Sequence, residues 1–159
     1  MAWWCAPTNS GQRLEDYEVA LIRQMNRLYN AGHLDALAEL FTPLLPVYTD
    51  KGISLRATHA DTKASLTNLR ETALSRGAVR VEHRILGVHT SPKGTSKAVS
   101  VEWLYLGADG TPVATGEVKY YCGRDSYGIA RILMVEYSKP AFPEAYSHLT
   151  PLSDGRTLN

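Results

Sequence analysis

The sequence predicts an α+β fold in which helices come first and a single antiparallel sheet follows. Apolar side chains recur at helical spacing over 14–41 and 58–76. Four consecutive segments then alternate apolar and polar side chains, with glycine-containing turns between them. These predicted strands are 79–89, 97–106, 113–122 and 129–138. An unbroken run of strands favours an antiparallel meander, because parallel strands need long crossover connections. We therefore expect a curved sheet wrapped around a pocket.

Three helices are expected before the meander. The first covers about 14–30 and the second about 33–41, each with an apolar face. The third begins near Thr58, because Thr58 and Asp61 have the spacing of a capping box, with Asp in place of the usual Glu or Gln.

A short strand is expected between the second and third helices. Pro43 ends the second helix, since proline cannot continue the hydrogen-bond ladder. Residues 47–49 then have strand character, and Gly52 marks a turn.

Length and composition indicate one ordinary globular domain. The chain has 159 residues, of which 44% are hydrophobic, and its 17 basic and 16 acidic residues nearly balance. This balance argues against a nucleic-acid partner. Cys5 and Cys122 have no metal-ligand spacing and are expected as free thiols in a reducing compartment. Without a membrane-spanning run or a signal peptide, a cytoplasmic location without membrane association is expected.

The expected domain organisation has three parts. Residues 1–12 form a flexible leader, 13–140 form the domain, and 141–159 form an irregular tail with a turn near 144–148.

Alternation along the four strands predicts which side chains face the helices, because successive strand residues point to opposite faces. The predicted inner face consists of Val81, His83, Ile85, Val99, Val101, Trp103, Tyr105, Gly116, Val118, Tyr120, Cys122, Leu133, Val135 and Tyr137. The opposite, outer face mixes charged residues with Leu104, Leu106, Tyr121, Ile132 and Met134. Since apolar patches of this kind mark interfaces, we expect a homodimer through the outer face.

Two motifs resemble the NTF2-like, or SnoaL-like, superfamily. The segment Leu28–Phe41, LYNAGHLDALAELF, resembles the opening motif of these proteins, with His33 where Asp is usual. Residues 110–113, GTPV, resemble a turn between two strands of their sheet. The resemblance covers about 14–138. It implies an α+β cone fold, in which three N-terminal helices and a curved sheet enclose a pocket, and it implies dimers.

The resemblance does not carry over the best-understood catalytic sites of this fold. Ketosteroid isomerase uses a tyrosine and two aspartates, and these positions correspond here to Met25, Thr49 and Val118, with Asp50 beside Thr49. Limonene epoxide hydrolases use an Asp–Arg–Asp set, and the nearby inward positions here hold Val101, Trp103 and Val135. Neither mechanism is expected, and function must be argued from the site itself.

The candidate site combines polar groups on the inner face and at its rim. His83 or Asp50 is the candidate base, and Tyr120 and Tyr48 are candidate hydrogen-bond donors. The expected ligand-binding residues are Tyr17, Met25, His59, Val101, Trp103, Tyr105, Val118, Leu133, Val135 and Tyr137. Each polar group also has a structural interpretation: His83 as a satisfied core residue, Asp50 as a turn residue, and the tyrosines as pocket wall.

Two functions stay open at this point. One is a small cofactor-free enzyme that binds an apolar metabolite and performs acid–base chemistry of the isomerase, cyclase, dehydratase or hydrolase type. The other is a non-catalytic domain of the same fold that binds a small ligand or forms a dimer. The sequence holds no metal-ligand spacing, phosphate-binding loop or nucleophile elbow, so no cofactor or metal is expected.

Overall fold

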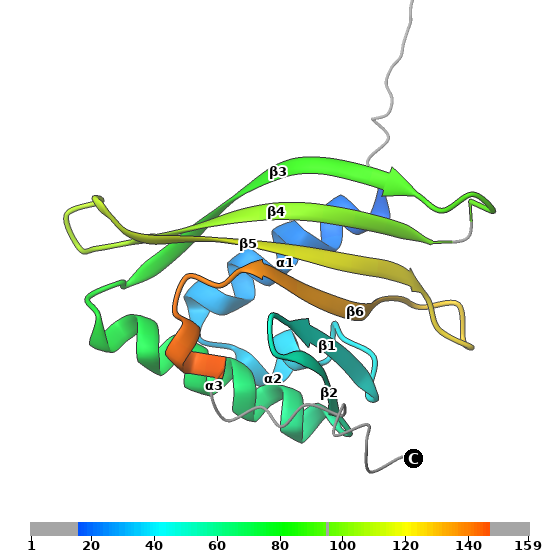
Figure 1. Ribbon diagram of the computed structural model, residues 1–159, viewed down its shortest axis with the longest axis horizontal. Coiled ribbons are helices and arrows are strands. Elements are labelled where there is room, and N and C mark those ends of the chain that lie inside the picture. Colours follow the sequence, from blue (N-terminus) through cyan, green and yellow to red (C-terminus); the bar gives the residue numbers. More distant parts are fainter. Residues whose placement is uncertain (1–15, 95, 147–159) are drawn as a thin grey trace, which may run out of the picture.

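The computed structural model describes residues 16–94 and 96–146, which form helices on one side of a curved sheet (Figure 1). The predicted leader and most of the predicted tail lie outside the described residues. The elements are α1 (Tyr17–Ala31), α2 (Leu34–Ala38), β1 (Leu45–Thr49), β2 (Gly52–Arg56), α3 (His59–Ser75), β3 (Arg80–Thr90), β4 (Lys97–Leu106), β5 (Pro112–Arg124), β6 (Ala130–Lys139) and the 3₁₀ helix η1 (Pro143–Tyr146). The predicted order of elements is confirmed, with β2 as an additional strand.

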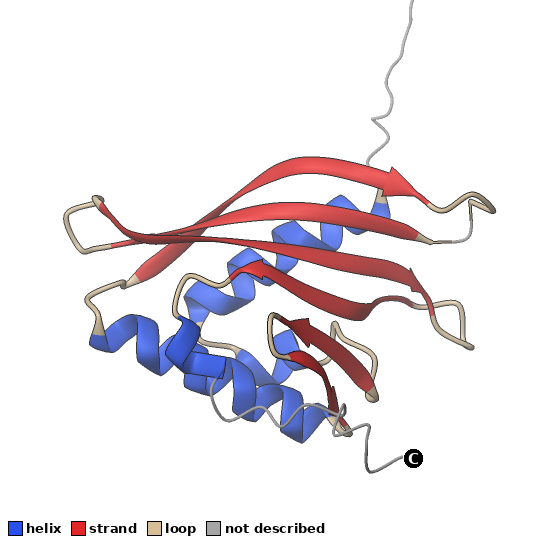
Figure 2. Cartoon of the chain, viewed as in Figure 1, coloured by secondary structure: helices blue, strands red, loops and turns tan. Residues whose placement is uncertain are grey.

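The sheet has six strands in the order β2-β1-β6-β5-β4-β3. Every neighbouring pair is antiparallel except β1 and β6, where Val47 pairs with Val135 in parallel. The four long strands form the predicted meander, and the short β1–β2 hairpin extends it on the β6 side (Figure 2). The fold is therefore α+β, with three helices packed on a mostly antiparallel sheet.

The opening motif contributes side-chain hydrogen bonds that join α1 to β3, the edge strand of the sheet. The Asn30 amide donates to the Val81 carbonyl and accepts from the Val81 N–H, so it pairs with β3 as a neighbouring strand would. Gly32 ends the helix with φ +75, the left-handed conformation that glycine adopts at low cost. At the start of α3, the predicted capping box of Thr58 and Asp61 is present in both directions. Among the described helices, none is long and apolar enough to cross a membrane.

The inner face of the sheet carries the core. On β4, Val99, Val101, Trp103 and Tyr105 are all buried, as their alternation predicts. On β6 the prediction was wrong at one point, because the β5–β6 register shifts beside Cys122. This bulge shifts the alternation.

Three residues therefore differ from their predicted placement. One was predicted to face inward and two were predicted to face outward. Leu133 packs against Gly123, away from the cavity described below. Ile132, predicted outward, pairs with Cys122 and is fully buried. Leu106, also predicted outward, is buried next to a second register shift.

The chain after β6 folds back over the inner face. Gly116 makes room for it, since a Cβ there would lie 2.9 Å from both the Ala141 nitrogen and the Lys139 oxygen. Phe142 is then buried with its ring 5.0 Å from that of Tyr105. The packed core thus continues beyond residue 140, into η1.

Candidate ligand-binding site

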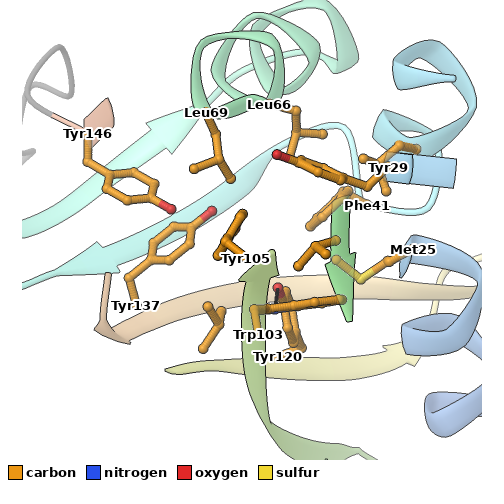
Figure 3. Close-up of a pocket in the computed structure, with 13 residues that line it drawn as sticks. Met25, Tyr29, Phe41, Leu66, Leu69, Trp103, Tyr105, Tyr120, Tyr137 and Tyr146 are labelled. Carbon is orange, nitrogen blue, oxygen red and sulfur yellow. Dashed lines mark hydrogen bonds between the residues drawn. The ribbon is translucent and has the colours of Figure 1, made fainter. Parts of the chain in front are cut away.

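A cavity lies between the inner face of the sheet and the three helices (Figure 3). Its volume, counted as the space open to the centre of a water-sized molecule, is about 40 Å³. That is room for about three water molecules. The lining residues come from α1, α2, α3, four strands, η1 and the segment after α2 that holds Phe41. They are Met25, Tyr29, Leu37, Phe41, Leu66, Leu69, Val81, Trp103, Tyr105, Val118, Tyr120, Tyr137 and Tyr146.

Five tyrosines supply most of the polarity of the cavity wall: Tyr29, Tyr105, Tyr120, Tyr137 and Tyr146. Burial raises the pKa of Tyr29 to about 12. It also raises the pKa of Tyr105, Tyr120 and Tyr146 well above the usual value, and that of Tyr137 in the same direction. All five hydroxyls are therefore neutral at physiological pH and keep a proton to donate.

A hydrogen bond between two wall residues orients one of these hydroxyls. Trp103 Nε1 donates to the Tyr120 hydroxyl at 2.9 Å, and the two rings meet edge to face. Because an indole N–H can only donate, the Tyr120 oxygen is the acceptor and its own proton remains for a second partner. Tyr120 is thus set up to donate to an oxygen of a molecule in the cavity.

At the other end of the cavity, Tyr137 and Tyr146 lie against each other, with ring centroids 4.4 Å apart. Their hydroxyls point toward one another in Figure 3. Tyr105 lies between this pair and the helices, with its ring 6.3 Å from that of Tyr29. The wall therefore combines aromatic faces with hydroxyls at both ends, an arrangement typical of small-molecule sites.

Comparison with known proteins identifies the architecture through structure rather than through sequence. No model of a known protein family matches the chain, and neither does any curated protein. Solved structures match it well. One is an NTF-2 like protein of unknown function from Shewanella oneidensis, at 16% identity and a TM-score of 0.56, covering 74% of this chain and 93% of the other.

The chain has the NTF2-like fold. Aln2 from a Streptomyces species shares it at 14% identity and a TM-score of 0.60, covering 83% of this chain and 93% of Aln2. So does a protein from Catenulispora acidiphila solved in complex with S-DNPA, at 16% identity and a TM-score of 0.55, covering 74% of this chain and 88% of the other.

In this NTF2-like fold, six residues singled out from the sequence line the cavity. They are Met25, Trp103, Tyr105, Val118, Tyr120 and Tyr137. Met25 and Val118, which the resemblance matched to the tyrosine and one aspartate of ketosteroid isomerase, line the cavity with apolar side chains. Val101 and Val135 are fully buried in the core and do not line the cavity.

His83 lies beneath α1 and outside the cavity lining. Asn26 Nδ2 donates to the Val81 carbonyl, so its Oδ1 faces His83 and accepts a hydrogen bond from His83 Nδ1. The proton therefore sits on Nδ1, and Nε2 carries the lone pair. Burial, followed by the nearby charge of Arg23, lowers the pKa of His83. The centroid of the His83 ring lies 5.8 Å from that of Trp103. His83 therefore supports a wall residue from behind and does not itself line the cavity.

The four remaining candidates also lie outside the lining. Asp50 is exposed at the β1–β2 turn, and Tyr48 is half-buried on β1. His59 Nε2 lies 2.8 Å from the Phe41 carbonyl at the start of α3. The ring of Tyr17 lies under the Arg124 guanidinium, 4.9 Å away. The structure thus does not bring His83 and Asp50 together with the cavity tyrosines.

Sequence reasoning missed several wall residues. Tyr29 follows Met25 by four positions, so helical spacing places both on one face of α1 and was a usable signal. Tyr146 follows a proline-containing segment that gives no periodic signal, and only the return of the chain over Gly116 brings it to the wall. Within the described part of the chain, no group of three metal-ligating side chains exists.

Proposed function

We propose that this protein binds a small, mostly apolar molecule with a hydroxyl or carbonyl group in the cavity of its NTF2-like fold. The observation that carries the proposal is the chemistry of the wall. Of the 13 described residues that line the cavity, five are tyrosines, one is a tryptophan and the others are apolar. Aromatic faces would hold the carbon skeleton, and neutral hydroxyls would select oxygen-bearing ligands.

The same wall favours binding over acid–base catalysis. A general base needs a pKa near the working pH and must lie within hydrogen-bond reach of the proton it takes. The titratable side chains in the lining are all tyrosines with raised pKa values. His83 and Asp50, the bases expected from the sequence, are not part of the lining. One observation supports the catalytic alternative, since the free proton of Tyr120 can polarise a carbonyl.

The size of the cavity sets how a ligand can enter. Space for about three water molecules is less than an aromatic ring needs, so wall side chains must turn aside. Met25 is the wall residue best suited to this, because its flexible thioether chain adapts to different shapes. The Catenulispora acidiphila protein was solved in complex with S-DNPA, which supports the capacity of this fold to hold a small molecule.

Binding of three related probes tests the proposal: naphthalene, 2-naphthol and 2-naphthoate, titrated calorimetrically at pH 7. We expect 2-naphthol to bind more tightly than naphthalene, because it adds a hydroxyl that a cavity tyrosine can bind. Tyr120→Phe should reduce that preference by about 2- to 10-fold, the worth of one neutral hydrogen bond. Tyr121→Phe is the matched control, since Tyr121 bonds Glu136 and not a wall residue. Absence of binding of all three probes contradicts the proposal.

We further propose, as the sequence predicts, that the outer face of the sheet forms a homodimer. Leu104, Tyr121 and Met134 lie there partly exposed. Arg84 forms an ion pair with Glu102 along the same face. With the buried Ile132 and Leu106 no longer part of it, the face is less apolar than the sequence suggests.

A further inference from the structure

Strand β2 turns polar side chains toward the core and an apolar side chain toward solvent, the reverse of the usual pattern. Ser54 and Arg56 are each only 5% exposed, whereas Leu55 between them is 42% exposed. Leu45 and Val47, their partners on β1, are buried on the same face. A strand that packs on a core normally turns its apolar residues inward, so this inversion opposes the stability of the fold. Such local conflicts are expected where a strand serves a function.

Arg56 is 5% exposed, and its guanidinium has one hydrogen-bond partner among the described residues. Its Nε donates to Ser65 Oγ on α3 at 2.6 Å. Within residues 16–94 and 96–146, no ion pair and no further hydrogen bond engages its two Nη groups. Burial of a charged group without a charged partner is costly, and desolvation accordingly lowers the pKa of Arg56.

The acid that acts on this charge is already engaged elsewhere. Besides the desolvation that lowers the pKa of Arg56, Asp61 is the carboxylate whose charge raises it. The Asp61 carboxylate accepts the backbone N–H of Thr58 in the capping box, and Asp61 is exposed. Arg56 bonds Ser65 on α3. One helical turn further along α3, Asn68 donates to the Ala145 carbonyl, next to the wall residue Tyr146. Arg56 has no carboxylate in ion-pair contact within the described chain.

A second buried polar atom lies on the neighbouring helix. Thr62 is 3% exposed, and its Oγ1 has no hydrogen-bond partner among the described residues. Thr62 precedes Leu66, a wall residue, by one helical turn and Ser65 by three residues, so all three project from one side of α3. Arg56 and Thr62, both more than nine-tenths buried, thus lie behind the cavity lining beside α3. A ligand reaches them only when wall side chains turn aside, as the small cavity already requires.

We propose that the ligand of this cavity carries a carboxylate, which the Nη groups of Arg56 bind at the Tyr137–Tyr146 end. The inference rests on the proposed function and adds the charge of the ligand to it. A guanidinium presents two parallel N–H groups that match the two oxygens of a carboxylate. The Tyr146 hydroxyl donates to that of Tyr137, whose own proton remains to donate to the same oxygens, while the aromatic wall holds the rest of the molecule.

The probes of the binding experiment separate this inference from the proposed function. At pH 7, 2-naphthoate is an anion and 2-naphthol is neutral, so their affinity ratio reports the charge preference. We expect wild-type protein to bind 2-naphthoate about 10- to 100-fold more tightly than 2-naphthol, the worth of hydrogen bonds to a charged group. Arg56→Met should abolish this preference and leave the 2-naphthol affinity within about twofold, because only the charged partner is lost.

Two further variants make the result specific. Arg56→Lys keeps the charge but loses the two-pronged geometry, so an intermediate preference is expected. Arg84→Met removes an exposed arginine on the outer face and should leave the preference unchanged. Thermal unfolding of Arg56→Met without ligand should show an equal or higher Tm, since an arginine without an ion-pair partner is replaced by an apolar chain of similar length.

Each outcome decides the inference. Equal affinity of wild-type protein for 2-naphthoate and 2-naphthol overturns it and leaves the proposed function standing. Absence of binding of every probe overturns both. A preference for 2-naphthoate that survives Arg56→Met and Arg56→Lys assigns the anion to another site and overturns the inference. Failure of Arg56→Met to fold, combined with an unchanged preference in Arg56→Lys, makes Arg56 a structural residue and also overturns it.

Discussion

Removal of the Tyr120 hydroxyl is expected to destabilise the protein although the change deletes only one oxygen. Trp103 and Tyr120 are 6% and 5% exposed, and their 2.9 Å hydrogen bond is the one that Trp103 Nε1 makes among the described residues. In Tyr120→Phe the phenyl ring still fills its place, but the indole N–H loses its acceptor. A buried polar group left without a partner costs about 1–3 kcal/mol.

We expect Tyr120→Phe to lower the free energy of unfolding by about 2 kcal/mol, the middle of that range. For a chain of this size, that corresponds to a decrease in Tm of about 4–8 °C. Urea denaturation followed by far-UV circular dichroism measures the change without relying on tryptophan fluorescence. Combination with Trp103→Phe closes a double-mutant cycle, in which a coupling energy of about 1 kcal/mol is expected for a single buried hydrogen bond.

The next residue in the chain is the matched control. Tyr121 points to the outer face and donates to Glu136 at 3.0 Å, where water can replace the lost hydroxyl. Tyr121→Phe should therefore cost less than about 0.5 kcal/mol. The reasoning fails if Tyr120→Phe and Tyr121→Phe have equal effects, or if the cycle gives a coupling within about 0.3 kcal/mol of zero.

Four further predictions follow from the fold. Gly116→Ala should cost about 1–3 kcal/mol of stability by urea denaturation because its Cβ collides with the returning chain, whereas Gly87→Ala, with 3.8 Å of clearance, should cost less than half as much. Cys122 is fully buried with a pKa raised to about 12, so in a variant whose other cysteine is serine, Ellman's reagent should react only after unfolding; rapid reaction of the native protein would contradict this burial. Folding lowers the pKa of His83, so its contribution to stability is present above pH ~6.5 and is lost as pH falls toward the folded pKa. His83→Gln should reduce this loss of stability when unfolding is measured from about pH 5 to 8. Identical pH profiles of the variant and the wild-type protein would refute the assignment. If the outer face forms a homodimer, Leu104→Glu should produce monomers in sedimentation equilibrium, and a wild-type monomer would end that proposal.

Local periodicity accounts for what could be predicted about the fold. On β4, Val101, Trp103 and Tyr105 face inward because strand geometry alternates side chains regardless of what the strand packs against. The capping box at Thr58 and the glycine at the end of α1 are equally local, since they satisfy backbone groups within a few residues. These features needed no knowledge of distant contacts.

The candidate site was only half predictable, because its remaining parts depend on contacts between distant segments. His83 belongs to the inner face as predicted, yet α1 covers it through Asn26, so it is not part of the cavity lining. Leu133 was placed inside by alternation, which the β6 bulge interrupts. Tyr146 comes from a segment without periodicity that Gly116 admits to the inner face.

The sequence by itself determined the order of helices and strands and, where no bulge interrupts a long strand, the side that faces the core, because those depend on the 3.6- and 2-residue repeats of the backbone. Tertiary structure alone decided where the cavity closes and that Arg56, rather than Leu55, is turned inward. The orientation of β2 is opposite to the one its hydrophobic pattern predicts. It follows only from the packing of β2 against β1, α3 and the tyrosine wall.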